Sequence, residues 1–119
     1  MKRIAILTCW KWNERCTGAL CLKVFNNKSQ YFSRYKDEEI ELAAFWRCNG
    51  CDIDFRENAG MQEKIARILK EKIDVVHVGL CTQLKNEDNP EIRTECEEIT
   101  RICRFLEECG IEIVRGTHK

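Results

Sequence analysis

The sequence predicts an α/β fold: a four-stranded parallel sheet with helices on both faces. Two observations carry this prediction. Short apolar runs alternate along the chain with segments whose apolar residues recur at helical spacing. The apolar runs are also continuous, which is typical of strands covered on both sides. The length of 119 residues suits one domain, spanning 1–119.

Four segments have the character of buried strands. The first runs from Arg3 to Thr8 and the second from Ile40 to Trp46. The third, Ile73 to Leu80, is rich in β-branched valine, and the last is Ile111 to Val114. With a helical segment between each pair, the order is βαβαβαβ with right-handed connections, which predicts a flavodoxin-like arrangement.

Three segments carry the helical spacing. The first begins at a Thr17 cap and ends near Asn27. The second begins near Gly60, and the third follows Pro90 and ends near Cys109, before a glycine stop. The side chains expected on the inner faces are Leu20, Val24, Phe25, Met61, Ile65, Ile68, Leu69, Ile92, Ile99, Ile102 and Leu106.

The charge composition excludes some classes of partner. Twenty Lys and Arg residues balance twenty Asp and Glu residues. Nucleic acid requires a basic excess to neutralise phosphates, so neither it nor an anionic membrane surface is an expected partner. The first apolar run is too short for a signal peptide and no run approaches a membrane span, which predicts a cytoplasmic protein.

Cysteine is unusually frequent, with nine residues in the chain. A secreted disulfide scaffold is disfavoured because the number of cysteines is odd and no signal peptide is visible. The apolar pattern also predicts a hydrophobic core that is stable without disulfide bonds. In a reducing cytosol such a set of cysteines more often indicates metal or redox chemistry. The alternative is that free cysteines serve as small packing residues.

The cysteines follow the ends of the predicted strands. Cys9 follows the first strand, Cys48 and Cys51 the second, and Cys81 the third, while His118 follows the fourth. Because the carboxyl ends of parallel strands meet at one edge of a sheet, these side chains are expected at the edge where such folds bind ligands.

Three further cysteines are expected at the same edge. Cys16 precedes the first helix, Cys21 lies about one turn into it, and Cys96 falls in the first turns of the last helix. Cys103 and Cys109 are instead expected to be core or boundary residues. His77 lies inside the third strand and is expected to be a buried, hydrogen-bonded core histidine rather than a ligand.

Thiolates gathered in one place repel one another, and a bound metal offsets this cost. One zinc ion takes four ligands, whereas seven thiolates converge here, so an iron–sulfur cluster, or more than one metal, is favoured over a single zinc ion. Lys11, Arg15 and Arg47 lie beside the cysteines; they either balance the negative charge or are ordinary solvated side chains. Trp10, Trp12 and Trp46 either shield the site from water or cap the sheet as core.

The Cys48-x-x-Cys51 pair also permits metal-free dithiol chemistry of the thioredoxin type. That chemistry usually places a helix N-terminus at the first cysteine, which lowers its pKa. Here the next helix is expected only near Gly60, and Asp52 and Asp54 lie beside the pair. The metal-free interpretation therefore remains the weaker alternative.

A pattern over essentially the whole chain is similar to that of a known family. Its residues are Cys9, Cys16-Thr17-Gly18-x-x-Cys21-Leu22-Lys23, Phe32, Tyr35, Cys48-x-Gly-Cys51, His77, Cys81 and Gly116-Thr117-His118. This pattern resembles the CGGC-domain family. The resemblance implies a metal-binding domain that holds zinc through cysteines and histidines. The motif cysteines carried over by position are Cys9, Cys16, Cys21, Cys48, Cys51 and Cys81, with His118 in the terminal motif and Cys96 as a looser match.

Two positions depart from the family pattern. Asn49 replaces the first glycine of the central motif and tolerates similar left-handed backbone conformations. Asp52 replaces the usual proline, so this loop is expected to be less rigid than in the family pattern.

Three functions follow as hypotheses. The first is an iron–sulfur or other transition-metal protein in redox, metal handling or sulfur chemistry, with a redox partner protein. The second is a zinc-binding interaction module, and the third is a metal-free thiol redox enzyme. The sequence leaves open whether the protein is an enzyme.

Overall fold

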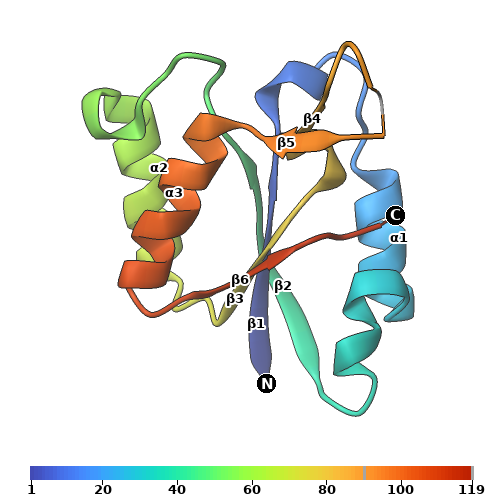
Figure 1. The fold of residues 1–119 in the computed structure, drawn as a ribbon. Coiled ribbons are helices and arrows are strands. Elements are labelled where there is room, and N and C mark those ends of the chain that lie inside the picture. Colours follow the sequence, from blue (N-terminus) through green and yellow to red (C-terminus); the bar gives the residue numbers. More distant parts are fainter. Residues whose placement is uncertain (90, 119) are drawn as a thin grey trace.

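Four parallel strands form the central sheet of the protein, for which a computed structural model describes residues 1–89 and 91–118 (Figure 1). The strands are β1 (Lys2–Thr8), β2 (Ile40–Arg47), β3 (Val75–Val78) and β6 (Glu112–Arg115). Their order across the sheet is β2-β1-β3-β6, and every neighbouring pair is parallel. The predicted α/β class with a four-stranded parallel sheet is confirmed.

Three α-helices connect these strands: α1 (Ala19–Asn27), α2 (Ala59–Lys70) and α3 (Glu97–Glu108). Short 3-10 helices add η1 (Trp10–Trp12), η2 (Gln30–Tyr35), η3 (Phe55–Glu57) and η4 (Leu80–Thr82). The side chain of Asn58 starts α2 by accepting a hydrogen bond from the backbone N–H of Met61 at 2.9 Å. None of the helices in the described residues is long and apolar enough to cross a membrane.

Alternate residues of β1 enter two different apolar clusters, because successive side chains of a strand point in opposite directions. Ala5 and Leu7 pack with residues of α2 and α3, whereas Ile4 and Ile6 pack with residues of α1 and η2. In Figure 1, α2 and α3 lie together, and α1 lies across the sheet from them. Burial of β1 in both directions explains why its apolar run is continuous.

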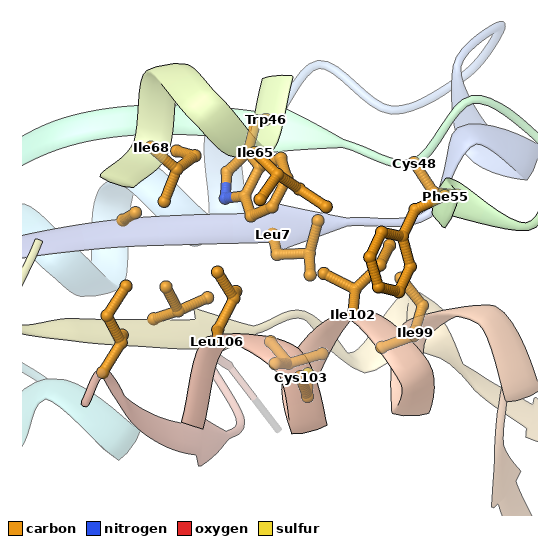
Figure 2. Packing of buried hydrophobic residues seen from close by; sticks show 14 of the residues in the cluster. Leu7, Trp46, Cys48, Phe55, Ile65, Ile68, Ile99, Ile102, Cys103 and Leu106 are labelled. Carbon is orange, nitrogen blue, oxygen red and sulfur yellow. The ribbon is translucent and has the colours of Figure 1, made fainter. Parts of the chain in front are cut away.

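The cluster around α2 and α3 contains two cysteines (Figure 2). Cys103 is fully buried and packs with Ile99, Ile102 and Leu106 of its own helix. Cys48 directly follows the carboxyl end of β2 and lies beside Phe55. The prediction that Cys103 is a core residue is therefore confirmed, whereas Cys109 is exposed at the C-terminal end of α3 and is a boundary residue.

The first helix differs from its prediction. It begins at Ala19 and its N-cap is Gly18, not Thr17; the Gly18 backbone takes a positive φ of 77°. Leu20, expected on the inner face, is exposed, and Cys21 takes the buried position instead. Cys21 lies three and four residues before Val24 and Phe25, so it falls on the same buried face of the helix.

The third connection differs more. The residues before the last helix form a two-stranded antiparallel hairpin, β4 (Gln83–Lys85) with β5 (Arg93–Glu95). The helix therefore begins at Glu97, Cys96 is its N-cap rather than a residue of its first turns, and Ile92 is exposed. Pro90, the expected first-turn residue, lies outside the described residues. Local helical spacing failed here because β5 pairs with β4, ten residues earlier.

Candidate functional site

Three thiols from three neighbouring strand ends meet at the carboxyl edge of the sheet. Cys9 follows β1, Cys48 follows β2 and Cys81 lies in η4 just after β3. The backbone N–H of Cys9 donates a hydrogen bond to Sγ of Cys81 at 3.2 Å. Because β1 lies between β2 and β3 in the sheet, Cys9 is placed between the other two.

The first loop directs further backbone N–H groups at these sulfurs. Trp10 donates to Sγ of Cys48 at 3.4 Å, and Lys11 donates to Sγ of Cys9, also at 3.4 Å. These bonds form because the chain turns into η1 immediately after Cys9, and Cys9 is the N-cap of that helix. Donors aimed at sulfur favour the thiolate over the thiol, and they are one of the means by which proteins tune thiolate-bound clusters.

A hydrogen bond joins the side chains of Cys9 and Cys48. The hydrogen bond from the Cys9 thiol to the Cys48 sulfur lowers the pKa of Cys48 to about 6, aided by the N–H groups of Trp10 and Gly50. The same hydrogen bond, together with burial, raises the pKa of Cys9 well above its usual range. The pair therefore carries one negative charge at neutral pH.

Lys64, which was not among the predicted site residues, binds the residues on either side of Cys48. The ammonium of Lys64 donates to the carbonyl of Arg47 at 2.8 Å and to the side-chain oxygen of Asn49 at 2.6 Å. These two residues flank Cys48, and the positive charge of Lys64 helps to lower the pKa of that thiol. Burial lowers the pKa of Lys64 itself.

The position of Lys64 could have been noticed in the sequence. It lies three residues after Met61 and four before Ile68, so it falls on the apolar stripe of α2. A lysine on such a stripe extends its charge to the end of the sheet. Arg47, for which charge balance and simple solvation were both left open, donates to the side chain of Asn13 at 2.5 Å.

Cys16 and Cys21 form a second group near the first. The N–H of Gly18 donates to Sγ of Cys16 at 3.3 Å. Sγ of the buried Cys21 lies 3.3 Å from the hydroxyl of Thr117, in the C-terminal segment after β6. Both sulfurs raise the pKa of Cys81 through charge repulsion, although burial of Cys81 is the larger cause. The two groups are thus electrostatically connected.

Three of the predicted ligands lie apart from these contacts. Cys51 is exposed on the loop after β2, and within the described residues it does not share the hydrogen bonds of the other sulfurs. Cys96 packs against the apolar cluster of α2 and α3. His118 lines a separate pocket with Tyr31 and Arg115.

The thiols are neighbours, but in this structure they do not form a complete metal-coordination site. Among residues 1–89 and 91–118, no three His, Cys, Asp or Glu side chains are arranged as the ligands of a metal ion. All nine cysteines are free thiols. The three tryptophans differ in burial. Trp46 is buried in the core, whereas Trp10 and Trp12 are about half exposed on η1.

His77 is fully buried, as predicted. Its Nε2 lies 2.7 Å from the hydroxyl of Tyr35, its Nδ1 lies 2.8 Å from the carbonyl of Gly116, and its ring stacks on Phe32. Burial lowers the pKa of His77 to about 4. The imidazole is thus a packing residue of the core, and its contact with Gly116 holds the C-terminal segment against the sheet.

Comparison with known proteins shows the family to which this chain belongs. The family model of the CGGC domain matches residues 3–118. An uncharacterized protein of Methanocaldococcus jannaschii is 35% identical over 124 residues, covering 98% of this chain and 86% of the relative. No solved structure matches the chain. Because the family match spans nearly all of the chain, the protein belongs to the CGGC-domain family.

Proposed function

We propose that the protein binds a transition metal through Cys9, Cys48 and Cys81, with Cys16 and Cys21 as the ligands that complete the set. The observation that carries this proposal is the set of hydrogen bonds that links the three strand ends. The Cys9 thiol donates to the sulfur of Cys48, and the backbone N–H of Cys9 donates to Sγ of Cys81 at 3.2 Å. A metal cation would replace the thiol proton of Cys9 and neutralise the thiolates.

The donor set fits a soft metal. Sulfur ligands select zinc, copper(I) and iron–sulfur clusters over hard cations. The charge of Lys64 and the N–H donors of Trp10 and Lys11 would offset the negative charge of a thiolate site. Binding requires the sulfurs to close around the ion, since as they stand the described side chains do not form a metal cage.

We favour an iron–sulfur cluster over a single zinc ion. Five thiols lie in the two connected groups, one more than tetrahedral zinc uses. Hydrogen bonds from N–H groups to sulfur are also a recognised means of setting cluster potentials. Bound there, such a cluster would supply electron transfer or sulfur chemistry. Zinc on four of these thiols, in an interaction module, is the alternative.

The experiment is anaerobic purification followed by a visible spectrum and analysis of iron, zinc and acid-labile sulfide. Brown protein with iron and sulfide is the expected result. Cys48→Ala and Cys9→Ala should lose the metal, whereas Cys109→Ala, a matched change at an exposed thiol on the opposite end of α3, should keep it. Colourless protein with stoichiometric zinc would support the zinc module.

One observation favours metal-free thiol chemistry as a second candidate. The low pKa of Cys48 makes it nucleophilic at neutral pH, and its partner is Cys9 rather than Cys51. Oxidation of the two thiols to a disulfide would pass two electrons and two protons to a disulfide of a partner protein. Folded, metal-free protein that forms a Cys9–Cys48 disulfide would support this candidate and overturn the metal proposal.

We also propose a flavodoxin-like architecture with helices on both faces of the sheet. The strand order β2-β1-β3-β6 and the two apolar clusters on alternate residues of β1 support it. In such folds ligands bind beyond the carboxyl ends of the strands, which is where the thiols gather. An experimental structure at atomic resolution would test this assignment.

A further inference from the structure

A pocket distinct from the thiols opens at the carboxyl ends of β3 and β6. Its volume is about 410 Å³, which falls in the range of small-molecule sites, roughly 300–1,000 Å³. Val78 and Leu80 line it from the end of β3, Arg115 and His118 from the end of β6, and Arg93 from the β4–β5 hairpin. The hairpin, which the sequence analysis did not predict, thus forms one wall.

The floor of the pocket is apolar. Val78 is almost fully buried, and Tyr31 forms another part of the pocket wall. Gly116 permits this wall: its φ is +146°, and a Cβ there would lie 2.6 Å from the ring of Tyr31. An alanine at this position would be strained and would push the ring away. The floor therefore suits an organic group rather than a bare inorganic ion.

The rim of the pocket is cationic and partly fixed. Arg115 donates from Nε to Oε1 of Glu95 at 3.1 Å and from Nη2 to Oε2 at 3.4 Å. Glu95 is itself held by the hydroxyl of Thr100 at 2.7 Å. These bonds use two of the five N–H groups of the guanidinium, and Arg115 also lines the pocket.

The second guanidinium lies across the hairpin. Nη1 of Arg93 donates to the carbonyl of Gln83 at 3.4 Å, which places Arg93 over the strand that faces the pocket. The two arginines and Glu95 together leave one net positive charge at the rim, apart from His118. One net charge suits a ligand with a single negative charge.

We propose that this pocket binds a small organic monocarboxylate, with its apolar body on Val78, Leu80 and Tyr31 and its carboxylate between Arg93 and Arg115. Arginine forks match carboxylates with two parallel hydrogen bonds. The pocket does not depend on the metal proposal, because none of the contacts used here involves a sulfur. It gives His118 a place in ligand binding rather than in the thiol group.

The proposal can be tested with benzoate as the probe and the full-length, isotope-labelled protein. Benzoate should shift the amide resonances of Tyr31, Val78 and Gly116 in nuclear magnetic resonance spectra, and neutral benzyl alcohol should bind at least tenfold more weakly, on the order of one lost charge-assisted contact. Arg93→Gln should weaken benzoate by roughly tenfold. Arg104→Gln, a matched change on the exposed face of α3, should leave it unchanged.

A variant that should bind benzoate more tightly distinguishes recognition of the carboxylate from a general effect on the structure. Glu95→Gln removes the carboxylate that competes for Arg115 and keeps a hydrogen-bonding side chain, so it should tighten benzoate severalfold. Loss of folding would move all resonances, whereas loss of the site moves only those of the pocket. Equal binding of benzoate and benzyl alcohol, binding of phenyl phosphate alone, or no change with Arg93→Gln would each overturn the proposal.

Discussion

Nδ1 of His77 lies 2.8 Å from the carbonyl oxygen of Gly116, which joins the middle of the sheet to the segment after its last strand. A carbonyl can only accept, so Nδ1 carries the proton. Nε2 of the neutral ring then accepts from the hydroxyl of Tyr35 at 2.7 Å. This fixes the tautomer of His77 and positions Thr117, whose hydroxyl contacts Cys21.

Replacement of His77 should destabilise the fold. His77→Leu leaves both the Tyr35 hydroxyl and the Gly116 carbonyl without their buried partner, and we expect a loss of about 2–4 kcal/mol in the free energy of unfolding. Tyr35→Phe removes one of the two bonds and should cost about 1–2 kcal/mol. Urea unfolding measures both, and equal stability of His77→Leu and the unmodified protein would contradict this role.

Stability should fall as the pH drops through the titration of His77. Its pKa is about 4 in the folded protein, because burial disfavours the imidazolium, and about 6.5 in an unfolded chain. Between these two values only the unfolded state binds the proton. The contribution of His77 is therefore full above about pH 6.5, declines by about 1.4 kcal/mol per pH unit, and is lost near pH 4.

Urea unfolding over this pH range checks the titration. A His77→Gln variant should be less stable near neutral pH but should lose this component of the slope. Parallel slopes for the two proteins would show that other groups, such as the carboxylates, account for the whole acid sensitivity.

The metal-free protein should contain one thiolate near neutral pH. The pKa of Cys48 is about 6, chiefly because the Cys9 thiol donates to its sulfur. Cys9→Ala removes that donor and should raise the pKa of Cys48 toward the ordinary thiol value of about 9. The ultraviolet absorbance of the thiolate during a pH titration measures the change. Cys109→Ala should titrate like the unmodified protein.

Lys64→Met should raise the same pKa by a smaller amount. The change removes the positive charge near Cys48 but keeps a long apolar side chain on the stripe of α2. The Cys48 titration should move upward while the unfolding free energy changes by less than about 1.5 kcal/mol, as for other substitutions of similar volume. An unshifted titration would show that Lys64 stabilises the loop only through Asn49 and Arg47.

Cys103 should matter for stability and not for metal. Cys103→Ser places a hydroxyl in the fully buried cluster of α2 and α3, at a cost of about 1–3 kcal/mol. Cys109→Ser, at an exposed position, should change stability by less than about 0.5 kcal/mol. Thermal unfolding and metal analysis of both variants provide the check, and metal loss in Cys103→Ser without unfolding would contradict the assignment.

Much of the fold follows from local patterns. The runs Arg3 to Thr8 and Ile40 to Trp46 became β1 and β2 with a change of at most one residue at each end. Such segments are predictable because strands buried in both directions leave a continuous apolar signature. The hairpin of β4 and β5 was missed because its strands are three residues long and exposed, so burial leaves no pattern in them.

The candidate site shows the same division. The placement of Cys9, Cys48 and Cys81 after three strands could be read from the sequence. The pairing of Cys48 with Cys9 rather than with Cys51 could not, because the motif spacing favours the nearer cysteine. In the folded chain η1 turns the first loop toward the end of β2, and the N–H of Trp10 meets Cys48.

By itself the sequence determined the alternation of strands and helices, and with it the edge of the sheet on which the strand-end cysteines lie, because connectivity and burial are recorded in local apolar patterns. Only the tertiary structure decided which backbone N–H groups bond to the sulfurs, that Lys64 binds the residues on either side of Cys48, and that His118 lines a pocket with Arg93 and Arg115. These relationships depend on distances of a few ångströms between residues remote in the chain, and those distances are set by strand register, loop turns and packing together.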